Sequence, residues 1–342
     1  MPTWRLLLPG STSLLTLTIA TVGGWFGYLL IGDAGWLLGA LVTTLAAAFK
    51  GMPLGYATSV QSIVIVLVGI SIGSMLHPGM ISEVVQWVPS ILGLFIAVLI
   101  TLIGVGYYLR RFGRYDHNTS VLAAYPGHLV IILQLATKHP CDAQKVATIQ
   151  SLRMLFLVLL LPTIAFIWMP EQSDKQLPTD YVALGWISLA GLAGVLLAWL
   201  LNIPAALLIG AMAGSGFAAL SGTEIVALPG TLKVTIFILT GAMIGSRFVN
   251  THWREICRIL PVALVAMSIT MLTSAAIALP VAWLTGLNIA QILLAYAPGG
   301  AEVMSLIALA TGHDPAFVGL HHIIRLLAMA GFFPMLVKLA IK

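Results

Sequence analysis

The chain has 342 residues, of which 60% are hydrophobic and only 8% are charged, and its mean hydropathy is +1.05. These values exclude a soluble globular domain and indicate a polytopic membrane protein, so we expect the lipid bilayer as a partner. The net charge of +5 is not concentrated in a basic run suited to nucleic acid. We therefore expect no nucleic-acid partner and interpret the excess of Lys and Arg as a signal of loop orientation.

Each half of the chain contains six apolar segments. In the first half they cover 13–31, 34–49, 58–76, 88–109, 119–137 and 145–169. In the second half they cover 182–201, 204–220, 231–246, 260–284, 289–311 and 318–337. A membrane span needs about 20 apolar residues, so the second and third segments of each half are marginal. The polar stretch 170–180 is the expected linker between a first membrane repeat, 1–169, and a second, 181–342.

The two halves repeat one pattern at an offset of 172 residues. Pro126 within AYPGH recurs as Pro298 within YAPGG, and GISIGS at 69–74 recurs as GAMIGS at 241–246. Four further residues of the first half, Asp142, Val146, Arg153 and Pro162, recur as Asp314, Val318, Arg325 and Pro334. One register held across several segments predicts an internal duplication.

Loop charges predict that one segment in each half does not cross the bilayer. Cytoplasmic loops are enriched in Lys and Arg. The basic loops contain Arg110, Arg111 and Arg114 in the first half, and Arg247, Arg254 and Arg258 in the second. The two basic loops fall on the same side of the bilayer only if each Pro-Gly segment enters and leaves the membrane from one side.

This arrangement gives five crossings per half, opposite orientations of the halves, and two cytoplasmic termini. We therefore expect an all-α polytopic membrane protein. It would consist of two inverted repeats of five crossing helices, each with a Pro-Gly re-entrant hairpin or broken helix. Such repeats are common in secondary transporters.

The Pro-Gly interruptions are the expected binding elements. Pro126 and Pro298 stop a helix, while Gly127, Gly299 and Gly300 allow the chain to turn. Non-helical backbone within a membrane is tolerated only where protein or a water-filled cavity covers it. The freed N–H groups at a new helix start can then face an anion or a polar ligand. The alternative is an ordinary kinked helix, since Gly and Pro are common in membrane helices.

A polar stripe follows each interruption. It reads Asp142, Val146, Gln150 and Arg153 in the first half, and Asp314, Val318, His322 and Arg325 in the second. These spacings place each set on one helix face, with the Asp at the helix start as a cap. A charged Arg inside a membrane costs about 2.5–3.5 kcal/mol, so both Arg should face the protein interior. Two roles remain open for them, hydrogen bonds to the carbonyls of the hairpin tip and direct binding of an anionic solute.

Two titratable residues near the interruptions lack an equivalent in the other half. Glu302, which corresponds to Val130, is either a proton carrier or cation ligand, or one member of a buried pair. His128, which corresponds to Gly300, either tunes the binding cavity or is a hydrogen-bonded packing residue.

The sequence offers no pattern for a metal or cofactor. The eight His residues are scattered, and the adjacent His321 and His322 point to different faces of a helix. We expect no metal site, no cofactor and no enzyme activity. The GxxxG spacings, Gly69 with Gly73 and Gly241 with Gly245, predict close helix contacts and leave open a homodimer interface.

The pattern Pro-Gly-(x)14-Asp-x3-Val-x3-[Gln/His]-x2-Arg occurs twice, accompanied by the related LLGAL and LLIGAM. Over nearly the whole chain these features resemble the membrane AbrB family, bacterial inner-membrane proteins described as a duplication and labelled ammonia monooxygenase or regulator. In that family the hairpin usually reads Pro-Gly-Gly and the stripe usually carries Gln. His128 and His322 therefore depart from the family pattern.

Three functions compete on this basis. A secondary transporter that moves a small anionic organic solute by alternating access, coupled to a proton or cation, accounts for the repeats, the interruptions and Glu302 together. A membrane-bound regulator of gene expression agrees with the family label. A metal-dependent membrane monooxygenase would need clustered copper or iron ligands. We expect a multi-pass protein of the bacterial inner membrane.

Overall fold

The structure, a computed structural model, describes residues 11–76, 80–125, 132, 136, 139–168, 180–203, 205–221, 229–249 and 253–340. Within these ranges it does not describe the side chains of residues 80–82, 158, 161–168, 253–256, 302, 330 and 332–340. The described elements are all α-helices, as the composition predicts, and no strand occurs among them.

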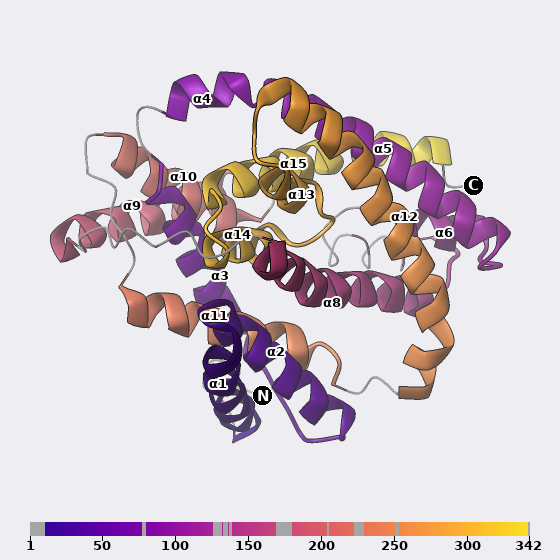
Figure 1. The fold of residues 1–342 in the computed structure, drawn as a ribbon, viewed down its shortest axis with the longest axis horizontal. Coiled ribbons are helices and arrows are strands. Elements are labelled where there is room, and N and C mark those ends of the chain that lie inside the picture. Colours follow the sequence, from indigo (N-terminus) through magenta and orange to yellow (C-terminus); the bar gives the residue numbers. More distant parts are fainter. Residues whose placement is uncertain are drawn as a thin grey trace. The chain divides into compact units, whose positions relative to one another are not determined.

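The helices of the first half are α1 Ser11–Ile31, α2 Ala34–Phe49, α3 Thr58–Gly73, α4 Met80–Gln86, α5 Val88–Arg111, α6 His117–Ala124 and α8 Ala143–Trp168 (Figure 1). Those of the second half are α9 Tyr181–Leu200, α10 Ala206–Leu220, α11 Gly230–Ser246, α12 Trp253–Thr285, α13 Ile289–Tyr296, α14 Ala301–Ala310 and α15 Pro315–Ala340. Each predicted apolar segment corresponds to one of these helices, except that the two Pro-Gly segments do not form continuous helices. The short helix α4 was not predicted.

Four of the described helices are long and apolar enough to cross a membrane. They lie at Ser11–Ile31, Val88–Arg111, Tyr181–Leu200 and Cys257–Thr285. The helices α2, α3, α10 and α11 are apolar but have only 15 to 17 residues, which agrees with the marginal length of the predicted segments. These helices are compatible with a multi-pass membrane protein.

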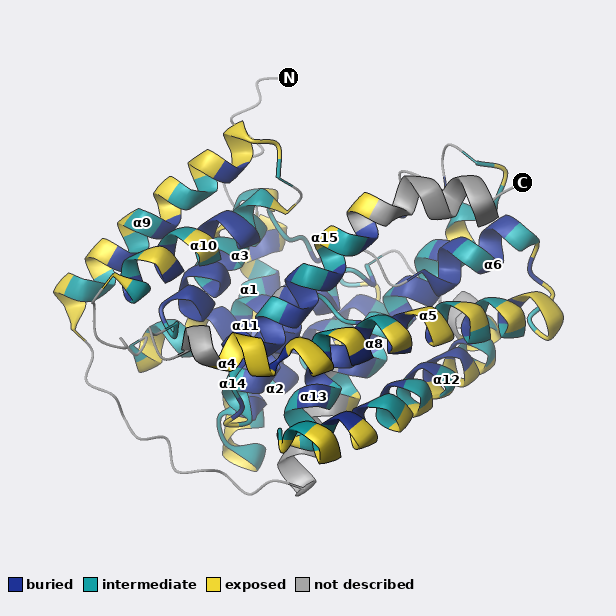
Figure 2. Cartoon of the chain, turned by 90° about the horizontal axis from the view of Figure 1, so that it is seen from above, coloured by how far each residue is buried: buried dark blue, intermediate teal, exposed yellow. Residues whose placement is uncertain are grey.

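The helix α9 has the most exposed apolar surface of the four long helices. Only 17% of its most apolar window is buried, and Figure 2 shows exposed residues along its length. The exposed fractions of Trp186 and Trp199 are 66% and 68%. Such a continuous apolar surface is suited to lipid rather than to water.

The chain forms two compact units, and each takes helices from both halves of the sequence. Unit 1 comprises Met1–Ile81, Phe166–Trp253 and Ser305–Ala316. Unit 2 comprises Ser82–Ala165, Arg254–Met304 and Phe317–Lys342. Unit 1 thus contains the first three segments of each half, and unit 2 contains both predicted interruptions.

Unit 1 contains two pairs of closely packed consecutive helices, α1 with α2 and α9 with α10. Glycine allows the two backbones of each pair to touch. A Cβ atom at Gly27 would overlap the carbonyl oxygen of Gly35, and one at Gly194 would overlap that of Gly210. Small residues of this kind let membrane helices approach closely and gain dispersion energy.

The first GxxxG pair makes the close contact predicted from its spacing. A Cβ atom at Gly69 would lie 2.7 Å from the Cβ of Ala211, and one at Gly73 would overlap the hydroxyl of Ser215. Residues later in α3 therefore contact residues later in α10. The two helices run parallel.

The second GxxxG pair repeats this geometry between α11 and α2. Cβ atoms at Gly241 and Gly245 would lie 2.8 Å from the Cβ atoms of Ala40 and Thr44, respectively. The helices α11 and α2 are therefore also parallel. In the repeat, α3 corresponds to α11 and α10 corresponds to α2. The two pairs, α3 with α10 and α11 with α2, are therefore equivalent contacts.

Candidate functional site

The predicted interruption of the second half is present in unit 2. Helix α13 ends at Tyr296, Ala297 is extended with φ −55° and ψ 135°, and α14 begins only at Ala301. The extended conformation is expected for a residue that precedes proline. Residues 297–300, which include Pro298, Gly299 and Gly300, are not helical. The prediction of a break rather than a kinked helix is confirmed here.

The first half has an equivalent helix that ends in the same way. Helix α6 ends at Ala124, and Tyr125 is extended with φ −65° and ψ 125°. Asp116 caps α6 and Asn288 caps α13, each by accepting a hydrogen bond from a backbone N–H of the first turn. Pro126, Gly127 and His128 lie outside the described residues.

Polar side chains of α8 and α15 hold the carbonyl oxygens at the ends of α6 and α13. The Gln150 amide donates to Tyr125 O at 2.9 Å and also to the carbonyls of Leu122 and Ala123. In the second half His322 Nε2 donates to Leu294 O, the equivalent of Leu122 O, at 3.0 Å. These carbonyls are the ones that a helix end leaves without partners.

Arg325 binds the second interruption with both terminal nitrogens. Nη1 donates to Ala297 O at 2.7 Å and Nη2 to Gly299 O at 2.9 Å. Nη2 also lies 2.7 Å from His322 Nδ1. Because a guanidinium only donates and a carbonyl only accepts, His322 must be neutral, with its proton on Nε2 and a lone pair on Nδ1. Of the two roles that the sequence left open for Arg325, the structure thus contains the hydrogen bonds to carbonyls at the interruption.

Arg153 occupies the equivalent position in the first half but is held more weakly. Its Nη1 donates to Tyr125 O at 3.3 Å, and that oxygen also accepts the shorter bond from Gln150. The buried Nε of Arg153 has no hydrogen-bond partner among the described residues. The two half-sites are not equivalent.

Neither Arg153 nor Arg325 forms an ion pair with a described side chain. Among the described side chains, the ion pairs join other residues, Lys145 with Asp142 and Lys233 with Asp33. The side chain of Glu302 is outside the description. The described part of unit 2 thus places two cationic groups at its interruptions without a described carboxylate paired to either.

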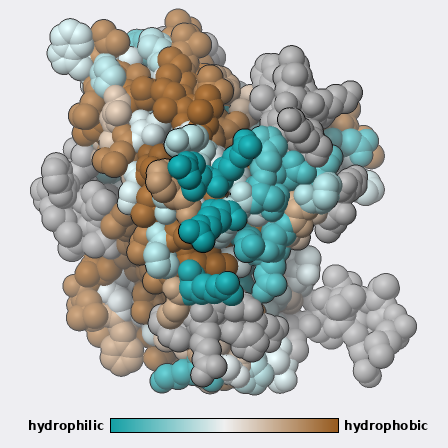
Figure 3. All heavy atoms as spheres, turned by 90° about the vertical axis from the view of Figure 1, so that its right-hand side faces the viewer, coloured by the Kyte–Doolittle hydropathy of each residue, from teal (hydrophilic) through white to brown (hydrophobic). Residues whose placement is uncertain are grey.

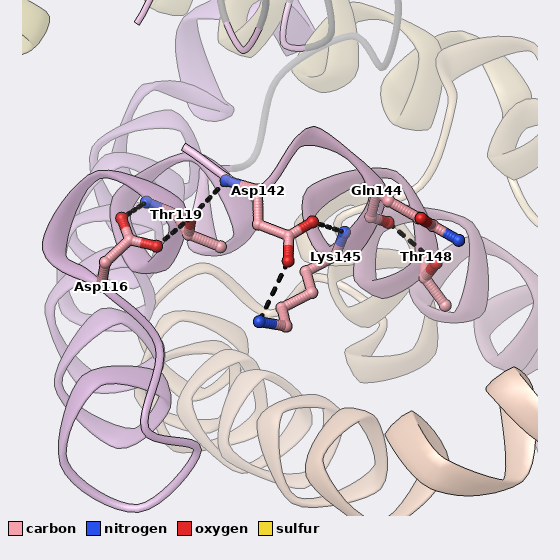
Figure 4. Close-up of polar contacts among 6 residues, drawn as sticks. All are labelled: Asp116, Thr119, Asp142, Gln144, Lys145 and Thr148. Atoms are coloured by element: carbon pink, nitrogen blue, oxygen red, sulfur yellow. Dashed lines mark hydrogen bonds and ion pairs between the residues drawn. The ribbon is translucent and has the colours of Figure 1, made fainter. Parts of the chain in front are cut away.

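Asp142 is the cap of α8, as predicted, and it lies close to the start of α6 (Figure 4). Its carboxylate accepts from Lys145 N at 3.0 Å and pairs with Lys145 Nζ at 3.0 Å. Its own N–H donates to the hydroxyl of Thr119 at 2.8 Å. That hydroxyl donates in turn to Asp116, the cap of α6. The starts of α6 and α8 are therefore joined through one threonine.

The pKa values of both capping carboxyl groups are lowered. For Asp142 the largest cause is the hydrogen bond from Lys145 N, and the Lys145 ammonium adds to it. For Asp116 burial acts to raise the pKa, but hydrogen bonds from the hydroxyl and N–H of Thr119 outweigh it. Both groups are stabilised as carboxylates at the end of unit 2. Asp314, the equivalent of Asp142, likewise caps α15 by accepting from Ala316 N at 2.8 Å.

A buried network that sequence reasoning missed connects α5, α13 and α15. His321 Nε2 lies 3.1 Å from the Ser90 hydroxyl, and Tyr296 OH donates to Ser90 O at 2.6 Å. Tyr125 OH donates to Met329 O at 3.0 Å. The tyrosines of AYPGH and YAPGG thus each bind a helix of the opposite half. The available signal was a hydroxyl in an apolar segment, because a buried Tyr usually has a hydrogen-bond partner.

Basic residues of both halves occur at one end of unit 2. Arg110, Arg111 and Arg114 are exposed where α5 ends, and Figure 3 shows hydrophilic side chains gathered on this side. Burial raises the pKa of the neighbouring Tyr115, with Asp142 and Tyr108 acting in the same direction, whereas the charge of Arg258 acts to lower it. Arg258 of the second half is therefore close to the basic loop of the first.

The family model described as transition state regulatory protein AbrB matches residues 36–341, and these include both interruptions and both polar stripes. The chain belongs to the AbrB family. A relative from Bacillus subtilis (strain 168), named "Uncharacterized protein YhjN", is 25% identical and covers 93% of this chain and 90% of its own length. A relative from Escherichia coli (strain K12), named "Putative regulator AbrB", is 24% identical and covers 86% of each chain.

Membership of the AbrB family confirms the resemblance drawn from the repeated Pro-Gly and Asp-Val-Arg pattern. The names of these relatives describe one as a regulator and leave the other uncharacterised, so the biochemical activity of this AbrB-family chain has to be argued from its site.

Proposed function

We propose that this protein is a secondary transporter that moves a small anionic organic solute across the bacterial inner membrane by alternating access, without chemical conversion of the solute. The observation that carries the proposal is the interruption after Tyr296, where buried polar side chains hold backbone groups that an uninterrupted membrane helix would satisfy itself. Secondary transporters bind solutes at discontinuous helices of this kind.

Helix directions in unit 2 support re-entrant hairpins. Asp142 lies beside Thr119 at the start of α6, and Gln150 lies beside Tyr125 at its end. The helices α6 and α8 are therefore parallel and adjacent, and the start of α8 lies beside the start of α6 rather than beside its end. The bonds from His322 and Arg325 to the end of α13 support the same relation between α13 and α15.

Helix directions in unit 1 support inversion of the two halves. The short loop Lys50–Ala57 joins α2 to α3, and consecutive spanning helices joined in this way run in opposite directions. Because α3 is parallel to α10, α2 is then antiparallel to α10, its own counterpart. The nearness of Arg258 to Tyr115 supports a common cytoplasmic side for the basic loops of both halves.

This topology can be tested by cysteine labelling. In a chain with Cys141 and Cys257 replaced by Ser, single cysteines at Arg114 and Arg258 should react with an impermeant reagent from the cytoplasmic side only. Both native positions are exposed. Labelling of the two positions from opposite sides would contradict the inverted arrangement and the cytoplasmic placement of both termini.

The described charged side chains at the interruptions of unit 2 favour an anion as the solute. Arg153 and Arg325 are two cationic groups at the interruptions, and N–H groups at the start of α14 add a positive helix end. We assign Pro298, Gly299 and Gly300, together with their counterparts Pro126, Gly127 and His128, to the solute site.

Glu302 is the proposed coupling residue, which binds a proton or a cation, because a lone carboxylate in an apolar segment is by default functional. Uptake into proteoliposomes should be lost, or its pH dependence should disappear, in Glu302→Gln. Glu83→Gln is the matched control, since Glu83 is exposed on α4. Unchanged uptake and pH dependence in Glu302→Gln would refute the coupling role.

The name of the E. coli relative favours a second function, a membrane-bound regulator that affects gene expression. Such an effect can follow from altered solute levels, in which case it depends on transport. A gene-expression response that persists in variants unable to take up solute would favour the regulator. A metal-dependent monooxygenase is the third alternative, and metal analysis of the purified protein together with an oxidation assay tests it.

A further inference from the structure

The equivalent residues Gln150 and His322 make different hydrogen bonds beside the two arginines. The Gln150 amide nitrogen points to three carbonyls at the end of α6, including Tyr125 O at 2.9 Å. It thus binds the carbonyl whose counterpart, Ala297 O, is bound by Arg325 in the second half. His322 instead bonds one carbonyl and offers Nδ1 to Arg325.

As a result, the two guanidinium groups differ in how fully they are hydrogen-bonded. Arg325 is held through Nη1 and Nη2 by two carbonyls and one imidazole. Among the described residues, Arg153 makes one long bond through Nη1, and its buried Nε has no hydrogen-bond partner. A guanidinium edge formed by Nε and a terminal nitrogen matches the two oxygens of a carboxylate.

We propose that Arg153 binds the carboxylate of the solute, whereas Arg325 is a positioning residue that holds the second interruption together. The inference rests on the proposed transport function. It adds that the solute carries a carboxylate and that one of the two matched arginines binds this carboxylate. A buried donor without a hydrogen-bond partner costs free energy, and a carboxylate removes this cost when it binds.

The test compares Arg153→Gln with Arg325→Gln in detergent, using the sodium salts of acetate, lactate, succinate and citrate against sodium chloride. At least one carboxylate should raise the unfolding temperature of the unaltered protein, because a ligand that binds the folded state stabilises it. Its affinity should fall about tenfold or more in Arg153→Gln. The exposed Arg111→Gln should retain both the affinity and the unfolding temperature.

Without carboxylate, Arg325→Gln should unfold at a lower temperature, while Arg153→Gln should match or exceed the unaltered protein. If Arg325→Gln does not fold, the substitution Gln150→His provides an independent measurement. It supplies an imidazole for Arg153 and should weaken the carboxylate response. Equal destabilisation by both Arg substitutions, an intact response in Arg153→Gln, or no response to any of the four carboxylates would overturn the inference.

Uptake measurements separate this inference from the transport function. Carboxylate binding through Arg153 without uptake into proteoliposomes would refute the transporter and leave the ligand assignment standing. Carboxylate uptake that is unchanged in Arg153→Gln would refute the assignment and leave the transporter standing.

Discussion

Replacement of Gly194 by Ala should destabilise unit 1, because α9 and α10 touch at this position. A Cβ atom there would overlap Gly210 O and lie 2.9 Å from both N and Cα of Gly214. All three atoms belong to backbone, so no side-chain rotation relieves the overlap. The helices have to separate by about 0.5–1 Å, which forfeits about a quarter to a half of the local dispersion energy.

The magnitude follows from comparison with Gly185 in the same helix. Overpacking typically costs about 1–3 kcal/mol. A Cβ at Gly185 meets no atom within 4 Å, so Gly185→Ala should show only the gain of about 0.5–1 kcal/mol for Gly to Ala within a helix. Because the gain in helix propensity is common to both variants, their free energies of unfolding should differ by the overpacking cost, about 1–3 kcal/mol.

Reversible unfolding of the purified protein in mixed micelles of increasing SDS content measures this difference. The two variants carry the same chemical change in the same helix, so an effect on intrinsic helix propensity cancels between them. Equal stability of the two variants, or greater stability of Gly194→Ala, would refute the conclusion that backbone contact at this glycine holds α9 against α10.

Three further predictions concern unit 2. Tyr296→Phe removes the hydroxyl that donates to Ser90 O and should lower the free energy of unfolding by about 1 kcal/mol, while Tyr28→Phe on the exposed side of α1 should have little effect. Because the pKa of Asp142 is lowered, its stabilising contribution is complete above about pH 4 and is lost as the pH falls through the lowered value. Asp142→Asn should flatten this part of the acid-unfolding curve, and an unaltered curve would contradict the capping role. Thr119→Val disconnects Asp116 from the N–H of Asp142 and should lower the unfolding temperature more than Thr18→Val, whose hydroxyl donates to Leu14 O within α1. Equal shifts would show that the bridge contributes nothing.

The sequence predicted the break at Pro298 and the caps at Asp142 and Asp314 because local covalent chemistry determines them. Proline has no N–H and displaces the residue before it from the helical region, whatever the surrounding fold. A carboxylate placed before an apolar periodic stretch accepts the unpaired N–H groups of the first turn. The close contacts of Gly69 and Gly241 were also predictable, since a GxxxG spacing places both glycines on one helix face.

The sequence by itself determined the helical class, the membrane character, the twofold pattern and the position of the interruption at Pro298, because hydrophobicity, proline and glycine act within a few residues. Only the tertiary structure decided how the matched arginines differ. Arg153 and Arg325 have the same spacing from the same motif, but their bonds depend on whether a Gln amide or a His imidazole reaches the carbonyls 25 to 28 residues earlier in the chain. Such a choice depends on the direction of donors and lone pairs in three dimensions, which no one-dimensional pattern specifies.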